Sequence, residues 1–184
     1  MVIGIVFLLC LASVPLARGR LAALAELSFR ARGLLLAAIA AQVLIVSVVP
    51  EGSATLHQAV HLGTYVAVAG FVVANRRIPW LWLVALGGAL NFVAIAANGG
   101  VMPADPHALA RAGLQVEAGA FTNSGAVAHP HLQFLGDVFW LPSSLPVSNV
   151  FSVGDLLIVL GALLAMHGVC ASRLAVRRFA VPAV

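Results

Sequence analysis

Residues 79–97 read PWLWLVALGGALNFVAIAA, a run that contains no charged side chain. Hydrocarbon offers no water to the backbone amides, so such a run must satisfy its hydrogen bonds internally as a helix. Its length is close to the about 20 residues that a helix needs to cross a bilayer. The run therefore predicts a transmembrane helix.

Four more apolar runs have the same character: about residues 2–17, 33–49, 57–74 and 153–171. Together the runs predict an all-α fold, a polytopic transmembrane helical bundle of about five spans. The first run is also compatible with a signal peptide. However, no basic residue precedes it and Arg18 and Arg20 follow it, so we expect a retained helix.

The composition excludes a water-soluble surface. Of 184 residues, 62% are hydrophobic and 9% are charged, whereas soluble domains carry about 25% charged residues. The length favours one membrane domain over residues 1–184. All ten basic residues are arginines that lie beside the apolar runs, an arrangement typical of a topology signal, so we expect the lipid bilayer and no nucleic acid as a partner.

The arginines predict an orientation. With five spans, Arg111 lies on one side and the other nine lie on the opposite side: Arg18, Arg20, Arg30, Arg32, Arg76, Arg77, Arg173, Arg177 and Arg178. The side rich in arginine is cytoplasmic by the positive-inside rule. We therefore expect a multi-pass protein of the cell membrane, with the amino terminus outside and the carboxyl terminus inside.

Residues 98–152 form the predicted outer loop, 55 residues with five prolines. Loops of this length are usually functional or disordered, and disorder is disfavoured because the stretch is apolar and weakly charged. Asp105, Pro106 and Gly113 have the positions of an N-cap, a first-turn proline and a C-terminal glycine, which predicts a short helix. Aromatic residues between positions 131 and 141 are expected in the outer interface, as part of a lid.

Two aspartates are candidate catalytic residues. Asp155 lies at the start of the fifth run, where a carboxylate can act as a general acid or base. The alternative is a capping box with Ser152. Asp137 can share a proton with Asp155 if the outer loop folds back over the bundle.

Four histidines are candidate metal ligands. His57 and His61 are one helical turn apart, and His129, His131 or Glu51 could complete a site with them. The alternative is that His57 and His61 form hydrogen bonds between helices. The sequence does not identify a cofactor, and the spacing of Cys10 and Cys170 predicts neither a disulfide nor a zinc site.

Three amides, Asn91, Asn98 and Asn149, are candidate residues for lining a cavity at the outer face. Interhelical hydrogen bonds are the alternative for Asn91 and Asn98. Gly99 and Gly100 follow Asn98, so we expect a sharp turn at this helix end.

Several motifs carry a resemblance that covers nearly the whole chain: Asn98-Gly99-Gly100-Val101-Met102-Pro103-Ala104, Phe121-Thr122-Asn123-Ser124, Leu135-Gly136-Asp137 and Asn149-Val150-Phe151-Ser152-Val153-Gly154-Asp155. The chain resembles an uncharacterised family, a domain of unknown function, of small polytopic membrane proteins from high-GC Gram-positive bacteria. This resemblance implies no activity.

A shorter likeness, over about a quarter of the chain, is to lipoprotein signal peptidase. Asn149 to Asp155 is similar to the Asn-x-x-Asp element of that family, and Gly87 to Asn91 is similar to its Gly-Asn-x-x-Asp element. The spacing from Asn149 to Asp155 is longer than in the peptidase, and the position three after Asn91 is Ala94 instead of aspartate.

These observations support two functions. The first is a membrane protein of unassigned activity whose outer face binds a lipid, a peptide or a membrane partner. The alternative is a membrane-embedded, aspartate-dependent hydrolase that acts on a lipid or lipoprotein-like substrate, with Asp155 and Asp137 as acid and base. A transporter would need polar groups at mid-membrane depth, and the runs contain almost none.

Overall fold

The computed structural model describes residues 2–48, 53–114, 124–125, 127–145 and 147–176. The described chain is mostly helical, as the sequence predicts. Its long helices are α1 (Val2–Leu16), α3 (Arg32–Val43), α4 (Ala54–Ala74), α5 (Leu81–Ala97) and α7 (Val153–Val169). Each of the five apolar runs therefore contains a long helix.

The helix bounds differ from the predicted runs most at α3 and α4. Helix α3 stops at Val43 and continues as a π-helical turn over Leu44–Val48, and α4 begins three residues before the predicted position 57. In the described chain, one segment, Thr55–Ala74, is long and apolar enough to cross a membrane by itself. The other apolar helices are shorter: Gly4–Leu16, Arg32–Val43, Leu81–Ala97 and Val153–Val169.

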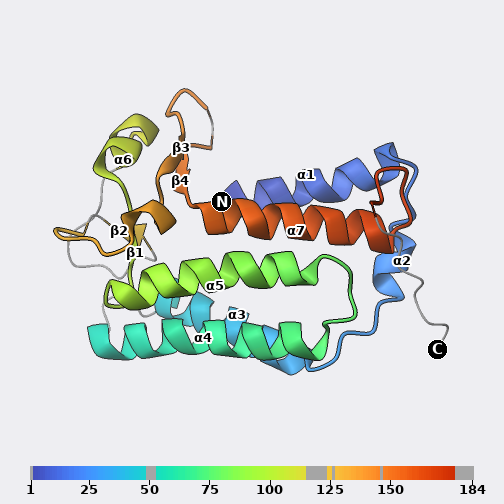
Figure 1. Ribbon diagram of the computed structural model, residues 1–184, viewed down its shortest axis with the longest axis horizontal. Helices are drawn as coiled ribbons and strands as arrows, with labels where there is room; N and C mark the ends of the chain where they lie inside the picture. The colour runs from blue at the N-terminus through green and yellow to red at the C-terminus, as the bar shows by residue number, and fades with distance from the viewer. Residues whose placement is uncertain (1, 49–52, 115–123, 126, 146, 177–184) are drawn as a thin grey trace.

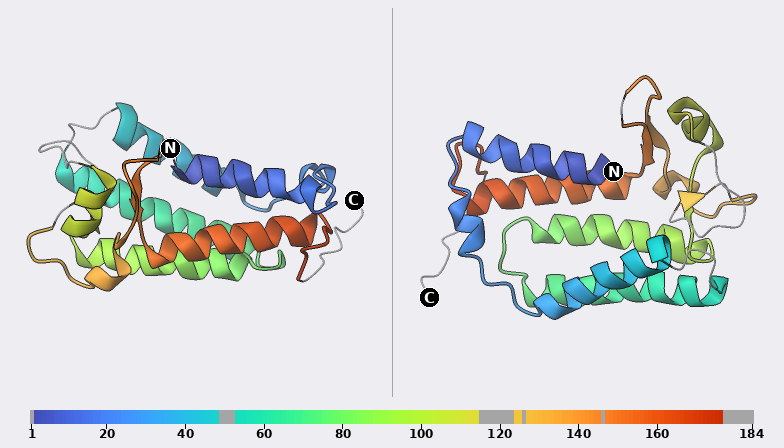
Figure 2. Two further views of the ribbon diagram at one scale, coloured as in Figure 1. Left: turned by 90° about the horizontal axis from the view of Figure 1, so that it is seen from above. Right: turned by 180° about the vertical axis from the view of Figure 1, so that it is seen from behind.

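The long helices lie side by side in the order α1, α7, α5, α4 and α3 (Figure 1). Along the chain they run in alternating directions, so that α1, α4 and α7 run one way while α3 and α5 run the other. Helix α3 packs on α4 on the face seen from behind (Figure 2).

The two ends of the bundle differ in character. The connections that carry arginine, residues 17–31, 75–80 and 170–176, gather at one end together with the short helix α2 (Ala22–Ala25). We call this the arginine end. Arg177 and Arg178 lie outside the described residues. The described residues of the stretch 98–152 gather at the other end, and we call them the outer unit.

The outer unit is folded, as the sequence predicts. Strand β1 (Met102–Pro103) pairs in parallel with β2 (Ser124–Gly125), and β3 (Phe139–Leu141) pairs in antiparallel with β4 (Asn149–Phe151). Helix α6 (Pro106–Ala112) has the predicted ends: the Asp105 side chain caps its first turn and Gly113 is left-handed, with φ 67. A single turn of 3-10 helix spans Gln133–Leu135.

The outer unit is attached to the bundle by apolar and polar contacts. Met102 packs with Ala94 and Ile95 of α5, and Leu135 joins this cluster. The Asn98 side chain brackets one backbone unit of the outer unit, because its Oδ1 accepts from the His131 N–H at 2.8 Å and its Nδ2 donates to the His131 carbonyl at 2.7 Å. The amide therefore anchors the outer unit to the end of α5.

Helix α1 is held to α7 by a buried polar chain as well as by an apolar cluster. His167 Nε2 lies 3.0 Å from Ser13 Oγ, and its Nδ1 lies 2.6 Å from Ser172 Oγ. Since the Ser13 hydroxyl donates to the Cys10 carbonyl, it must accept from a protonated Nε2. His167 therefore links α1 to the chain that follows α7.

Glycines let α5 and α7 approach closely. A Cβ at Gly87 would meet the carbonyl oxygen of Gly154 and the backbone of Ile158, and a Cβ at Gly161 would meet the backbone nitrogen of Val84 at 2.8 Å. Small residues at helix contacts are typical of membrane proteins, where backbones pack directly.

Gly87→Ala should lower the free energy of unfolding by about 1–3 kcal/mol, because its methyl group would force the α5–α7 contact apart. The matched control is Gly88→Ala, since a Cβ at Gly88 meets nothing within 4 Å. The control should be neutral or stabilising by up to about 1 kcal/mol, because alanine is the better helix former. Thermal unfolding of the purified variants measures both. Equal melting temperatures for the two variants would contradict this account of the contact.

Candidate functional site

The start of α7 contains the predicted capping box. The Ser152 N–H donates to Asp155 Oδ2 at 2.9 Å, and the Asp155 N–H donates to Ser152 Oγ at 3.0 Å. Reciprocal bonds of this kind satisfy helix N–H groups that have no partner within the helix. The predicted capping box of Ser152 and Asp155 is therefore confirmed.

Asn91 of α5 closes a polar network around this cap. Its Nδ2 donates to Asp155 Oδ1 at 2.8 Å, and its Oδ1 accepts from the Ser152 hydroxyl at 2.9 Å. A Cβ at Gly154 would overlap the Asn91 amide, so the network requires glycine there. Because both carboxylate oxygens of Asp155 are used, this carboxylate primarily joins α5 to α7.

Asp137 lies in the outer unit and is 3% exposed. Its backbone joins it to the chain before α6, because its N–H donates to the Pro103 carbonyl at 2.9 Å and its carbonyl accepts from the Asp105 N–H at 3.0 Å. The Ser124 side chain forms a hydrogen bond with its carboxylate. Thus β1, β2 and the segment before β3 meet around one buried acid.

The surroundings of Asp137 favour its protonated form. Burial is the main cause, the negative charge of Asp155 adds to it, and the hydrogen bond from Ser124 opposes it; together they raise the pKa of Asp137 from 3.8 to about 6. An acid with such a pKa is part protonated near neutral pH, as a general acid must be.

The predicted pair of carboxylates is close enough to interact electrostatically. The phenol of Tyr65, from α4, is within electrostatic range of both acids. The hydrogen bonds of the two acids go elsewhere, however: those of Asp155 to Asn91 and Ser152, and that of Asp137 to Ser124. The arrangement is therefore a cluster of coupled charges, with each acid held by its own partners.

The three candidate amides lie in different surroundings. Asn91 is buried and forms the interhelical bonds described above. Asn98 ends α5, where it anchors His131, and the chain then turns through Gly99 and Gly100, which both have positive φ as expected for this turn. Asn149 begins β4, opposite Leu141. All three amides therefore lie where the bundle meets the outer unit.

The candidate metal ligands fall into two groups. His57 and His61 are both buried on α4, and the Gln42 side chain of α3 lies 2.7 Å from His61 Nδ1. His129 and His131 are exposed in the outer unit, and Glu51 lies outside the described residues. Among the residues that the structure describes, no three His, Cys, Asp or Glu side chains are grouped to hold a metal ion. The contact with Gln42 is the kind that the interhelical alternative predicts.

Sequence reasoning missed three participants: Gln42, Ser124 and Asn75. Asn75 ends α4 and brackets the backbone of Arg30, accepting from its N–H at 2.9 Å and donating to its carbonyl at 2.8 Å. No periodicity or spacing connects residues 45 positions apart. The one available signal for Gln42 was that a polar amide in an apolar run needs a partner.

The chain matches the model of a family of unknown function, DUF5317, over residues 26–167. The matched residues include both carboxylates and all three candidate amides, and α1 precedes them. No curated protein and no solved structure matches the chain.

Asp137→Asn should change how stability depends on pH. With its raised pKa, folded Asp137 keeps its proton when the unfolded chain has lost it, so its favourable contribution is complete below about pH 4 and is lost as pH rises through about 6. Relative to the variant, the wild type should lose about 3 kcal/mol of unfolding free energy between pH 4 and pH 7, at 1.36 kcal/mol per pKa unit. Denaturant unfolding at several pH values measures this. If the wild type keeps the same unfolding free energy relative to the variant at every pH, or gains stability relative to it as the pH rises, the carboxylate charge of Asp137 is not buried.

Proposed function

This chain belongs to the family of unknown function DUF5317, and we propose that it is an integral membrane protein that crosses the bilayer five times and binds lipid with its outer unit. The observation that carries the proposal is the exposure of apolar surface along the helices. The lipid-binding part rests on the aromatic surface of the outer unit.

Helix α4 has the surface of a helix in lipid. Its segment Thr55–Ala74 is apolar, yet only 28% of its most apolar window is buried inside the protein. A core helix of a soluble protein with this composition would be mostly buried. Large apolar side chains are exposed on the other long helices too: Phe7, Leu8 and Leu9 on α1, Leu36 and Ile39 on α3, Trp82 and Val93 on α5, and Leu156 and Leu160 on α7.

The alternating helix directions support five crossings. Apart from α4, the helices are short for spans, and α1, with 15 residues, reaches about 22 Å. Helices α5 and α7 have 17 residues each, and α3 with its π-helical turn also covers 17, from 12 and 5. At 1.5 Å per residue these reach about 26 Å, somewhat less than the about 30 Å of hydrocarbon. Short spans are accommodated by local thinning of the bilayer at modest cost.

The charges favour an orientation with the arginine end in the cytoplasm. Glu26 is the one acidic residue in the three arginine-bearing connections. In the sequence, the other five acids come shortly before α4, between α5 and α7, or at the start of α7. Positive charge on short connections is retained on the cytoplasmic side. The outer unit would then face the outside of the cell membrane.

The outer unit has an exposed aromatic surface that suits lipid. Phe134 is 67% exposed, and Phe139 and Trp140 are 38% and 40% exposed. The Arg111 guanidinium lies 5.1 Å from the centre of the Trp140 ring. Amphipathic rings beside a cation are favoured at the headgroup level. A folded unit at the end of the bundle would hold them there.

One observation favours the alternative, an aspartate-dependent hydrolase acting on a lipid or lipoprotein-like substrate. The raised pKa of Asp137 suits a general acid. Against it, both oxygens of Asp155 are used by Asn91 and Ser152. If the protein is this hydrolase, Asp137→Asn should abolish hydrolysis of such a substrate while the protein stays folded. Retained hydrolysis in the folded variant would rule out the hydrolase alternative with Asp137 as its acid.

Labelling of introduced cysteines tests the topology. Ser144 is exposed in the outer unit and Ser28 is exposed at the arginine end, whereas Cys10 and Cys170 are buried. In intact cells, a membrane-impermeant maleimide should label Ser144→Cys, and it should label Ser28→Cys only after the membrane is opened. Unaltered protein controls for reaction at the native thiols. The reverse pattern would overturn the orientation, and labelling of both positions in intact cells would overturn the crossings.

Fluorescence quenching tests lipid contact at the outer unit. The double variant Trp80→Phe/Trp82→Phe leaves Trp140 as the single tryptophan. In vesicles, lipids brominated near the headgroup end of the acyl chain should quench Trp140 more than lipids brominated near the terminal methyl group, because the ring is expected at the interface. The variant Trp140→Phe, which reports on Trp80 and Trp82, is the control. If neither lipid quenches Trp140, the outer unit stands clear of the bilayer and a peptide or protein becomes its partner.

A further inference from the structure

Four exposed arginines are brought together at the ends of α3 and α4. The clamp between the Asn75 side chain and the Arg30 backbone fixes the connection before α3 against the end of α4. Arg30, whose backbone is held, and Arg32 therefore lie on the α3 side of the clamp. Arg76 and Arg77 lie on the α4 side, directly after Asn75. We call these four residues the basic cluster.

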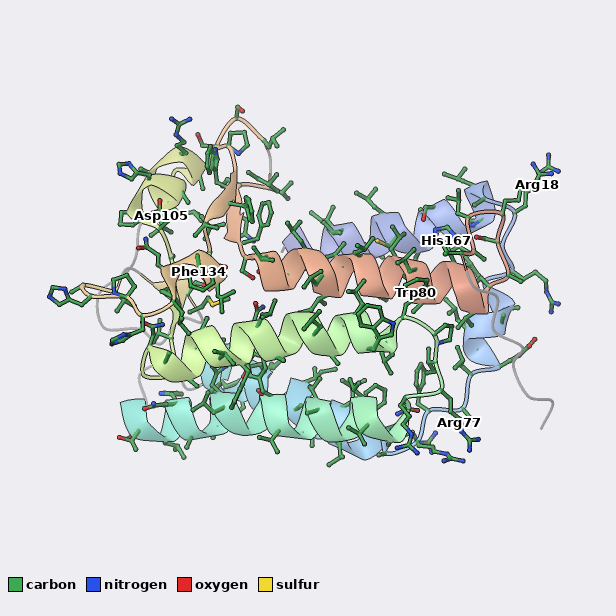
Figure 3. The ribbon with its side chains drawn as sticks, viewed as in Figure 1. Arg18, Arg77, Trp80, Asp105, Phe134 and His167 are labelled. Atoms are coloured by element: carbon green, nitrogen blue, oxygen red, sulfur yellow. The ribbon has the colours of Figure 1, made fainter. Side chains whose placement is uncertain are left out.

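The clamp is well supported by the packing around it. Asn75 is 5% exposed, and its Nδ2 also donates to the Phe71 carbonyl at 2.8 Å. The Phe29 ring packs against Phe71 with centroids 5.7 Å apart. The backbones that carry the arginines are therefore held in place, while all four arginines are exposed. Figure 3 labels Arg77, which lies at the outside of the bundle.

The basic cluster has no acidic partner among the described residues. The ion pair that the structure records joins Arg20 to Glu26 at 3.6 Å, and Arg20 belongs to a separate group beside α1 and α7. In that group the Arg173 N–H donates to the Ala17 carbonyl at 2.8 Å, next to Arg18. Figure 3 labels Arg18 and Arg77 at opposite corners of the arginine end.

Exposed apolar side chains adjoin the basic cluster. Phe29, Leu34 and Val73 are 45%, 42% and 63% exposed, and each lies within three residues of a cluster arginine. Guanidinium groups bind phosphate oxygens, often through two parallel hydrogen bonds. Phosphate recognition beside apolar surface fits a molecule that has both a phosphate and acyl chains, and a soluble phosphate would leave the apolar side chains uncovered.

We propose that the basic cluster is a binding site for an anionic phospholipid of the cytoplasmic leaflet, with the phosphate held by Arg30, Arg32, Arg76 and Arg77 and the acyl chains against Phe29, Leu34 and Val73. The site rests on the proposed membrane location. It adds a specific lipid at the inner face, distinct from the aromatic contact at the outer unit.

Native mass spectrometry of the full chain in detergent tests the site, with phosphatidylglycerol, phosphatidylcholine and inorganic phosphate as probes. The wild type should bind phosphatidylglycerol at least about 25-fold more tightly than phosphatidylcholine. Each arginine near an anionic lipid contributes about fivefold in affinity. Arg76→Gln/Arg77→Gln should therefore weaken phosphatidylglycerol binding by about 25-fold and leave phosphatidylcholine binding unchanged.

The matched control is Arg18→Gln/Arg173→Gln, which removes the same charge from the same end of the bundle outside the cluster. It should stay within about twofold of the wild type. Equal losses in both double variants would overturn the site in favour of diffuse surface charge, and so would equal wild-type affinity for the two lipids. Displacement of phosphatidylglycerol by equimolar inorganic phosphate would make the cluster a site for the free ion.

A second double variant, Arg30→Gln/Arg32→Gln, provides an independent result should the first unfold, and melting temperatures in detergent identify that case. Lipid binding is measured in detergent, without a bilayer. A failure to bind phosphatidylglycerol would therefore leave the proposal of five crossings unaffected. The maleimide labelling in cells addresses the crossings without reference to the lipid. The two proposals can therefore fail separately.

Discussion

The close contact between α5 and α7 is the interaction on which the rest of the structure depends. Glycines at positions 87, 154 and 161 leave room for backbone to meet backbone, and Asn91 links both elements through Ser152 and Asp155. Where water is scarce, each polar group in such a network must be satisfied by another, because an unpaired one is costly. The contact therefore tolerates little change in size or in polarity.

Both the outer unit and α1 take their positions from α7. Strand β4 ends at Phe151, and the Ser152 cap follows directly, so the last strand of the outer unit continues into the helix. On the other side, α1 is joined to α7 through His167. A buried acid, Asp137, then closes the outer unit over the end of the bundle, and its protonation is coupled to the charge of the cap.

Two asparagines anchor the opposite ends of the bundle by the same chemistry. Asn98 brackets the backbone of His131, and Asn75 brackets that of Arg30. An amide side chain presents an oxygen that accepts and a nitrogen that donates, so it can pair with both backbone polar groups of a single residue, as a neighbouring strand would. One anchor fixes the outer unit and the other fixes the basic cluster, which gives the bundle two ends of defined and different chemistry.

The sequence by itself determined the helices, the ends of α6 and the cap of α7, because apolar runs and capping residues act over a few neighbours. It also determined which connections carry arginine. Only the tertiary structure decided that Asn91 binds the second oxygen of Asp155, that Ser124 is the partner of Asp137, and that Asn75 holds Arg30. These contacts join residues 13 to 64 positions apart, and no local pattern encodes them, because they depend on how the helices pack.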